Sequence, residues 1–225
     1  MVAVVYTLVD GAVSHRLLDD WLAGIGPARR RRIERMRAAR DRRNSLLGLQ
    51  LLRRLLAQTG WPDFDLARVE YPPGDKPRLP LPVDFSISHS GDLIACAVST
   101  ESSVGIDVEA LDRPGPIPTR VLTLEENRWV GDDRGRFLAC WTRKEAALKC
   151  FGTRLAAIGR IATEPRRARL GAREAWLRPL SLAAGYVAHV ATERPEAVSI
   201  EALQLTAAGL RPAPPPPRRP PCAAR

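Results

Sequence analysis

Lysine is nearly absent from this 225-residue sequence, in which Lys76, Lys144 and Lys149 are the only lysines among 35 Lys and Arg residues. The remaining cations are arginines, and against 25 Asp and Glu residues they give a formal net charge of +10. Arg serves an ordinary surface charge as well as Lys does. Each lysine therefore marks a position where a compact ammonium group has a chemical reason of its own.

Other scarcities exclude whole classes of protein. No apolar run approaches the ~20 residues of a membrane span, and no basic residue precedes the apolar opening at Val2 to Val9. We therefore expect neither a signal peptide nor a transmembrane helix. The four cysteines form no CxxC motif and no zinc-like pairing with the three histidines, which favours reduced thiols in a cytoplasmic protein.

The basic excess lies at the two ends of the sequence. Residues 1–60 and 151–225 each hold 12 cations and 5 anions, whereas residues 61–105 hold 3 cations and 7 anions. This uneven distribution is unlike a surface that coats nucleic acid uniformly, so we expect any anion-binding role to be local. With 45% hydrophobic residues, the chain can bury an ordinary core as one domain or two small ones.

Hydrophobic patterning predicts an α+β fold with a small sheet in each half. The Arg-rich run after Pro27 predicts a surface helix over residues 28–43, and the leucines from Leu46 to Leu56 predict a core helix that ends near Gly60. Strands are predicted at 2–9, 85–90, 93–98, 104–109, 183–191 and 198–205, and further helices at 125–130 and 136–149. We predict an N-terminal half at 1–103, a C-terminal half at 104–205, and a disordered Pro/Arg-rich tail at 206–225.

Two carboxylates lie two residues apart on one predicted strand. The strand period of two places Asp107 and Glu109 on the same face, with Val104, Ile106 and Val108 toward the core. One interpretation is a solvated sheet face. The other is a Mg²⁺ site, because carboxylate oxygens are ligands that this cation prefers and a cation relieves their mutual repulsion.

Two of the three lysines fall within the nine residues from Trp141 to Lys149. Glu145 and Lys149 are four residues apart on the predicted helix, so they could form an ordinary surface salt bridge. The alternative is that Lys149 contacts a phosphate, because a compact ammonium can follow a phosphate charge that moves during a reaction.

The third lysine precedes the segment from Phe85 to Ser90, which contains a histidine and three serines. A lysine, a hydroxyl and an imidazole close in sequence could form a phosphate pocket together with Arg29 and Arg32. The alternatives are a structural strand histidine and a solvated arginine run. We assign no role to the other two histidines, His15 and His189.

Four segments together resemble the Sfp type of 4′-phosphopantetheinyl transferase, in the order and approximate spacing of that family. They are Gly74-Asp-Lys-Pro77, Phe85-Ser-Ile-Ser-His-Ser90, Val104-Gly-Ile-Asp-Val-Glu109 and Trp141-Thr-Arg-Lys-Glu-Ala-Ala-Leu-Lys149. Each motif alone is loose, whereas four in order are specific, and the resemblance extends over residues 2–205. It implies two similar α+β halves related by a pseudo-twofold, with coenzyme A bound in the cleft between them.

The resemblance also implies a reaction and a set of site residues. A serine hydroxyl of an apo acyl or peptidyl carrier protein attacks the pyrophosphate of coenzyme A and receives the phosphopantetheine arm, and adenosine 3′,5′-bisphosphate leaves. Asp107, Glu109 and Glu145 match the Mg²⁺ ligands, and Glu145 is also a candidate base for the serine. Lys149 matches the lysine at the pyrophosphate. The positions that match contacts to the 3′-phosphate and ribose are Lys76, Ser88, His89, Arg29 and Arg32.

Some residues extend this pattern or depart from it. Glu126, with Glu125 beside it, is a further candidate for the metal or water shell. Asn44 stands where the family commonly has arginine, and Arg154 stands where it usually has glycine. At the level of the family, we expect a cytoplasmic monomer that serves polyketide or nonribosomal peptide synthases.

Two rival functions remain. One is a family member that has lost activity and acts as an interaction protein. The other is a nucleic-acid-binding module that uses residues 29–43, and it leaves the carboxylates and the sparse lysines unexplained. We therefore expect an enzyme with coenzyme A and carrier-protein partners, and with no nucleic-acid or membrane partner.

Overall fold

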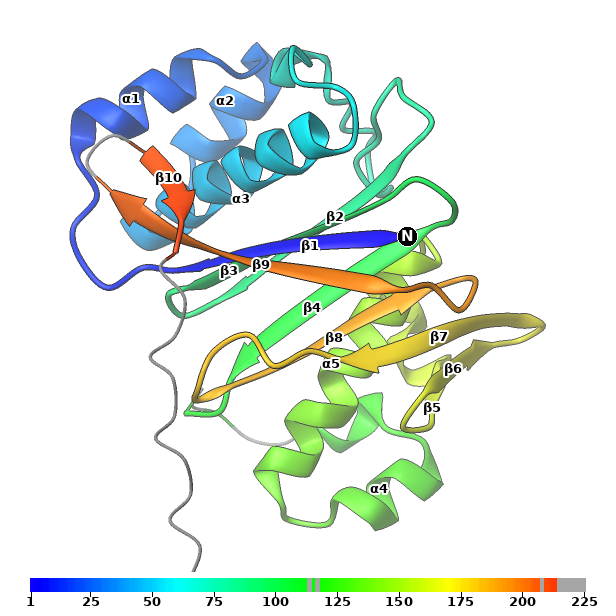
Figure 1. The fold of residues 1–225 in the computed structure, drawn as a ribbon. Coiled ribbons are helices and arrows are strands. Elements are labelled where there is room, and N and C mark those ends of the chain that lie inside the picture. The colour runs from blue at the N-terminus through cyan, green and yellow to red at the C-terminus, as the bar shows by residue number, and fades with distance from the viewer. Residues whose placement is uncertain (113–114, 116–117, 207–208, 214–225) are drawn as a thin grey trace, which may run out of the picture.

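The computed structural model shows two five-stranded sheets, and one long helix covers each of them (Figure 1). The structure describes residues 1–112, 115, 118–206 and 209–213. The first sheet has the order β10 (Gly209–Pro212), β9 (Val198–Thr206), β1 (Val2–Leu8), β3 (Leu93–Ser99) and β2 (Asp84–Ser90). The second has the order β4 (Val104–Ala110), β8 (Tyr186–Thr192), β7 (Arg173–Pro179), β6 (Arg167–Leu170) and β5 (Ala162–Thr163). This architecture confirms the α+β fold class.

Five α-helices and three short 3-10 helices connect the strands of the described chain. The α-helices are α1 (His15–Ala23), α2 (Pro27–Glu34), α3 (Ala39–Gln58), α4 (Leu124–Val130) and α5 (Arg134–Cys150). The 3-10 helices are η1 (Leu66–Arg68), η2 (Thr119–Val121) and η3 (Leu155–Arg160). Strands β2 and β3 pair antiparallel, which confirms the strands predicted at 85–90 and 93–98.

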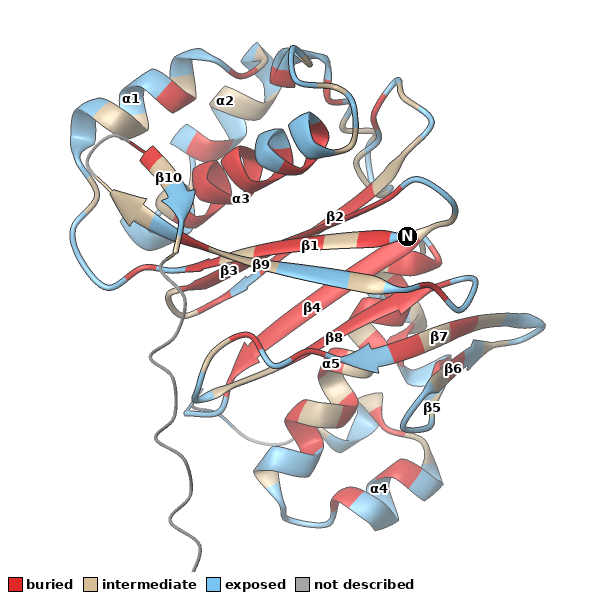
Figure 2. Ribbon diagram, in the orientation of Figure 1, coloured by how far each residue is buried: buried red, intermediate tan, exposed pale blue. Residues whose placement is uncertain are grey.

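The leucines of α3 form the centre of the first core. Leu47, Leu51, Leu52, Leu55 and Leu56 are all fully buried, and α3 packs on β1, β2 and β3. Figure 2 shows the buried face of α3 turned toward the first sheet. Each such side chain contributes about 1.5–3 kcal/mol to folding through removal of its apolar surface from water.

The single Arg-rich helix predicted over residues 28–43 is wrong, because the chain turns between Glu34 and Ala39. Pro27 does begin α2, which buries only Ile33, while the later arginines belong to the first turns of α3. The Arg42 Nη1 group donates to the Met36 carbonyl at 2.6 Å and braces the turn.

The two sheets meet along β2 and β4, and a shared apolar cluster fills the space between them. Val4 of β1 packs there with Val104, Ile106 and Val108, which confirms the predicted core face of β4. The opposite face of β4 lies against α5. A methyl group on Gly105 would lie 1.9 Å from the Ala146 carbonyl oxygen, so only glycine permits this close approach.

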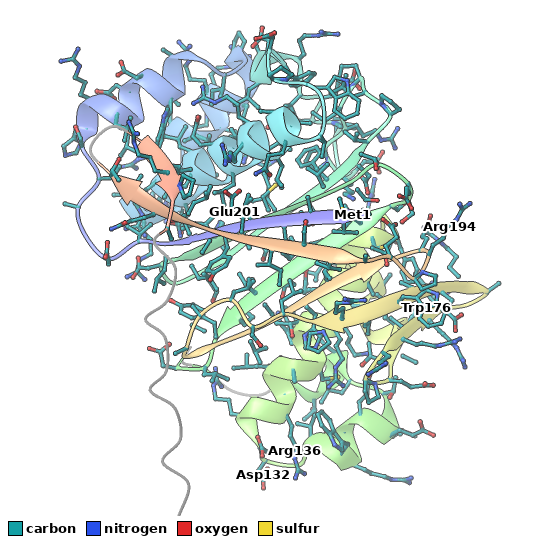
Figure 3. All side chains as sticks on the ribbon, in the orientation of Figure 1. Met1, Asp132, Arg136, Trp176, Arg194 and Glu201 are labelled. Atoms are coloured by element: carbon teal, nitrogen blue, oxygen red, sulfur yellow. The ribbon has the colours of Figure 1, made fainter. Side chains whose placement is uncertain are left out.

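The C-terminal strands do not follow the predicted division at residues 103/104 and 205/206. β9 pairs in parallel with β1 of the first sheet, and β10 pairs antiparallel with β9. In Figure 3, Glu201 projects from β9, where it accepts hydrogen bonds from Arg54 Nη2 at 3.0 Å and Gln58 Nε2 at 2.7 Å. The disordered tail predicted from residue 206 is therefore wrong for Thr206 and 209–212, whose backbone completes a strand pair. Residues 214–225 lie outside the described chain.

Helix α1 and strands β5 to β7 of the described chain were not predicted from the sequence. Cys96, Cys140 and Cys150 are free and buried, in agreement with the expected thiols, whereas Cys222 lies outside the described residues. Among the described helices, none is both long and apolar enough to cross a membrane.

Candidate active site

Asp107 and Glu109 face α5 from neighbouring positions on β4, and both are buried, at 5% and 6% exposure. Burial on this scale excludes the solvated sheet face that the sequence left open. Asp107 Oδ1 accepts from Lys149 Nζ at 2.7 Å and from Ser88 Oγ at 2.8 Å. Glu109 accepts from Trp141 Nε1 at 3.1 Å and from Ser90 Oγ at 2.7 Å.

Three residues of α5 lie opposite these carboxylates. Trp141, Glu145 and Lys149 are spaced by four, so they share one face of the helix. Trp141 reaches Glu109 and Lys149 reaches Asp107, which places half-buried Glu145 between the two contacts. Lys149 also donates to the Ile106 carbonyl at 3.0 Å, so its ammonium sits against the strand rather than in solvent.

The donor set of this region suits a hard cation. Asp107 Oδ2 is buried and has no hydrogen-bond partner, while its other oxygen has two donors. An unpartnered buried carboxylate oxygen is costly unless a cation meets it, and oxygen ligands are those of Mg²⁺. Within the described residues, no three His, Cys, Asp or Glu side chains already converge at metal-binding distance. The set Asp107, Glu109 and Glu145 therefore fits Mg²⁺ chemically and stays a prediction.

A cavity of about 510 Å³ lies between the two halves of the chain. It reaches Lys149, whereas none of the three carboxylates lines it. It gathers most of the cationic candidates from separate segments. Its lining includes Arg29 and Arg32 of α2, Lys76 of the 72–77 loop, His89 of β2 and Lys149 of α5. Tyr71 and Phe85 add aromatic surface.

The side chain of Arg29 lies at the wall of this cavity rather than in solvent. Its guanidinium lies 5.0 Å from the centre of the Tyr71 ring, and its Nε is buried without a hydrogen-bond partner. Burial lowers the pKa of Arg29, and burial also raises the pKa of Tyr71. A guanidinium with an unpartnered buried N–H is suited to receive an anion, which disfavours the solvated-run interpretation for this residue.

His89 lines the cavity and is exposed. Desolvation by the cavity walls lowers the pKa of His89, and Lys149 and Arg29 lower it further, whereas Asp41 and Asp107 act in the opposite direction. The ring is therefore neutral at neutral pH. A bound phosphate would raise its pKa.

Two of the other candidates have protein partners. Lys76 forms an ion pair with Asp84 and donates to the Val104 carbonyl at 2.6 Å, so it joins the two halves at the cavity wall. Ser88 is buried and does not line the cavity, because its hydroxyl is directed to Asp107.

Glu126 belongs to a different cluster and does not complete the metal shell. Its carboxylate accepts from the Thr123 and Thr163 amides at 2.7 and 2.8 Å, and it pairs with fully buried Lys144 at 2.7 Å. Burial opposes ionisation of Glu126, but the hydrogen bond from Lys144, together with those from Thr123 and Thr163, lowers its pKa overall. This capping box on α4 was a missed signal, since Thr123 and Glu126 stand three residues apart.

The two departures from the family pattern have structural roles. Asn44 is buried, and its Nδ2 donates to the Gly91 carbonyl at 3.0 Å, so it supports the β2–β3 turn. The Arg154 guanidinium packs against the 72–77 loop, where a methyl group on Gly74 would lie 2.8 Å from Nη2. Gly74 also has a φ of +76°, which favours glycine.

Comparisons with known proteins converge on one family. Residues 103–186, which contain β4 and α5, match the model of the 4′-phosphopantetheinyl transferase superfamily. The L-aminoadipate-semialdehyde dehydrogenase-phosphopantetheinyl transferase of Mus musculus is 30% identical over 162 residues, which are 60% of this chain and 52% of the relative. The 4′-phosphopantetheinyl transferase AcpT of Salmonella typhi is 37% identical over 79 residues, which are 32% and 41% of the two chains.

A third relative is the 4′-phosphopantetheinyl transferase gsp of Aneurinibacillus migulanus. It is 25% identical over 162 residues, which are 68% of this chain and 66% of the relative. The match to the mouse protein thus spans about half of that relative's length. The family match covers the segment that carries both β4 carboxylates and the facing residues of α5.

Proposed function

We propose that this chain belongs to the 4′-phosphopantetheinyl transferase superfamily, whose model matches residues 103–186, and that it transfers the phosphopantetheine arm of coenzyme A to a carrier protein. The acceptor is a serine hydroxyl of an apo acyl or peptidyl carrier protein. The observation that carries the proposal is one cavity that joins three cations and an imidazole to Lys149 beside the β4 carboxylates.

The cavity's charges suit the phosphates of coenzyme A. We assign Arg29, Arg32, Lys76 and His89 to the 3′-phosphate and ribose, because these groups line the cavity from the first half. Lys149 lines the same cavity from the second half and extends to Asp107, so we assign it to the pyrophosphate. Binding the nucleotide between the halves would hold the reacting phosphorus next to β4 and α5.

Transfer requires that charge be neutralised while one P–O bond forms and another breaks. The carrier serine oxygen attacks the phosphorus that bears the pantetheine arm, and adenosine 3′,5′-bisphosphate leaves with the electron pair of the broken bond. Lys149 stabilises negative charge on the pyrophosphate, and Glu145 takes the serine proton. Asp107, Glu109 and Glu145 would hold Mg²⁺, which supplies further positive charge against the phosphate oxygens when it is bound.

The family likeness also supports a proposal on the cellular location, the oligomeric state and the partner synthases of this chain. We propose that the chain acts as a cytoplasmic monomer and serves polyketide or nonribosomal peptide synthases. Exposed arginines of α2 such as Arg31 could steer the acidic helix that is usual in carrier proteins.

The test is incubation of the full chain with coenzyme A, Mg²⁺ and an apo carrier protein, followed by mass spectrometry of the carrier. We expect the carrier to gain one phosphopantetheine, and we expect EDTA to stop the gain and added Mg²⁺ to restore it. No gain on several carriers, peptidyl types included, would refute the proposed activity. A Glu145→Gln variant that transfers at the normal rate would remove only the assignment of the base.

A further inference from the structure

A row of serines on β2 replaces a strand partner for β4. Both are edge strands of their sheets, so the outward amides of β4 have no backbone carbonyl to bond. The hydroxyls of Ser86, Ser88 and Ser90 accept these bonds instead. The amides of Ile106, Val108 and Ala110 donate to them at 3.1, 3.4 and 3.0 Å respectively.

The direction of the Ser88 hydroxyl proton follows from its partners. A serine oxygen has two lone pairs and one proton. The Val108 amide and the Lys149 ammonium, at 3.4 and 3.2 Å, both donate to this oxygen and use its lone pairs. The proton is therefore available only to Asp107 Oδ1, 2.8 Å away. This bond holds Asp107 with Oδ1 toward the serine and leaves buried Oδ2 without a protein partner.

Ser90 repeats the arrangement one step along the strand. It accepts from the Ala110 amide and donates to Glu109 Oε2 at 2.7 Å, while Trp141 holds the other oxygen. Ser86 occupies the first step and accepts from the Ile106 amide at 3.1 Å. Its hydroxyl has no carboxylate acceptor within the described residues, so it provides the link between strands alone.

We infer that Ser88 and Ser90 are positioning residues, which orient Asp107 and Glu109 for a divalent cation while they join the two sheets. This inference rests on the proposed function for its catalytic meaning. It changes the role that the resemblance implies for Ser88, from a contact of the coenzyme A phosphate or ribose to a support of the carboxylate. Ser86 shares the link to β4 without the carboxylate bond and is the matched control.

The test measures Mn²⁺ binding to the full chain by electron paramagnetic resonance, without substrate. We expect Ser88→Ala and Ser90→Ala each to weaken Mn²⁺ affinity by about tenfold or more, as outer-shell partners of metal ligands do, and Ser86→Ala to leave it unchanged. Ser88→Thr keeps the hydroxyl and should restore the affinity. Ser88→Cys keeps the size with a weaker donor, so it supplies a folded comparison should Ser88→Ala fail to fold.

A second measurement separates this role from a phosphate contact. The ratio of dissociation constants for coenzyme A and 3′-dephospho-coenzyme A, taken in EDTA, should be the same for wild type and Ser88→Ala. A changed ratio with unchanged Mn²⁺ affinity overturns the inference, and so does equal weakening of Mn²⁺ by all three serine variants. A wild type that binds no Mn²⁺ also overturns it. A wild type that binds Mn²⁺ but modifies no carrier refutes the proposed function and leaves the serine roles standing.

Discussion

His189 makes the stability of this protein depend on pH in a way that can be worked out from its surroundings. The residue lies on β8 opposite Asp107 of β4, is 5% exposed, and shares a 2.8 Å hydrogen bond through Nδ1 with Thr142 Oγ1. Burial lowers the pKa of His189 to about 3, with Arg143 adding to the effect. The folded state therefore keeps the ring neutral throughout mildly acidic solution.

The sign follows from the proton that only the unfolded chain binds. An unfolded histidine has a pKa near 6.5, so the unfolded state binds a proton below that pH. The folded state binds this proton only near pH 3. Stability contributed by neutral His189 is complete above pH 6.5 and falls by about 1.4 kcal/mol per pH unit below it. The loss at pH 4.5 amounts to about 2.7 kcal/mol relative to neutral pH.

Urea unfolding at pH 7.0, 5.5 and 4.5 measures this loss. The variant His189→Gln keeps a polar group beside Thr142 but does not titrate. Its free energy of unfolding should therefore lack the decrease of about 2.7 kcal/mol at pH 4.5. His15→Gln, at an exposed position of α1, controls for removal of a histidine. An equal decrease in His189→Gln and wild type would refute the burial argument.

Three further predictions concern charged groups. Glu126→Gln leaves the Lys144 ammonium buried without its anion and should cost about 3–5 kcal/mol in urea unfolding; no recovery in the double variant Glu126→Gln/Lys144→Met would contradict this. Arg29→Ala should weaken coenzyme A binding by about tenfold or more in calorimetry and spare 3′-dephospho-coenzyme A, and an equal loss for both ligands would refute the phosphate contact. Arg154→Gly should raise KM for coenzyme A but not for the carrier, and a reverse pattern would exclude a role at the 72–77 loop.

Local patterns were sufficient for much of the fold. The leucine spacing of α3 and the alternation in β2 show which side of each segment is apolar. Burial of that side determines whether the segment forms a helix or a strand. The turn between α2 and α3 could not be found in this way, because the arginines around it have no apolar period. Pairing of β9 with β1 joins residues nearly 200 apart in sequence, and no local signal contains it.

The candidate site shows the same limit. The period of two placed Asp107 and Glu109 on one face, and the structure places that face against α5. The partner of Ser88 depended on how the edges of two sheets meet, and the alternation of β2 could not show that. His189 received no role from its sequence neighbours, although its burial opposite Asp107 gives it the pH dependence worked out above.

The three lysines of this molecule have two different physical roles. Lys76 and Lys149 line the cavity, in keeping with a phosphate role, whereas Lys144 is fully buried and is not part of that lining. Its ammonium has three N–H donors, and three oxygens meet it: Glu126 Oε2 and the carbonyls of Ile158 and Ile161. An arginine there would bring five donors in a fixed planar arrangement to a buried site where three oxygens already meet an ammonium. Lysine at this position therefore has a structural reason that is independent of any reaction.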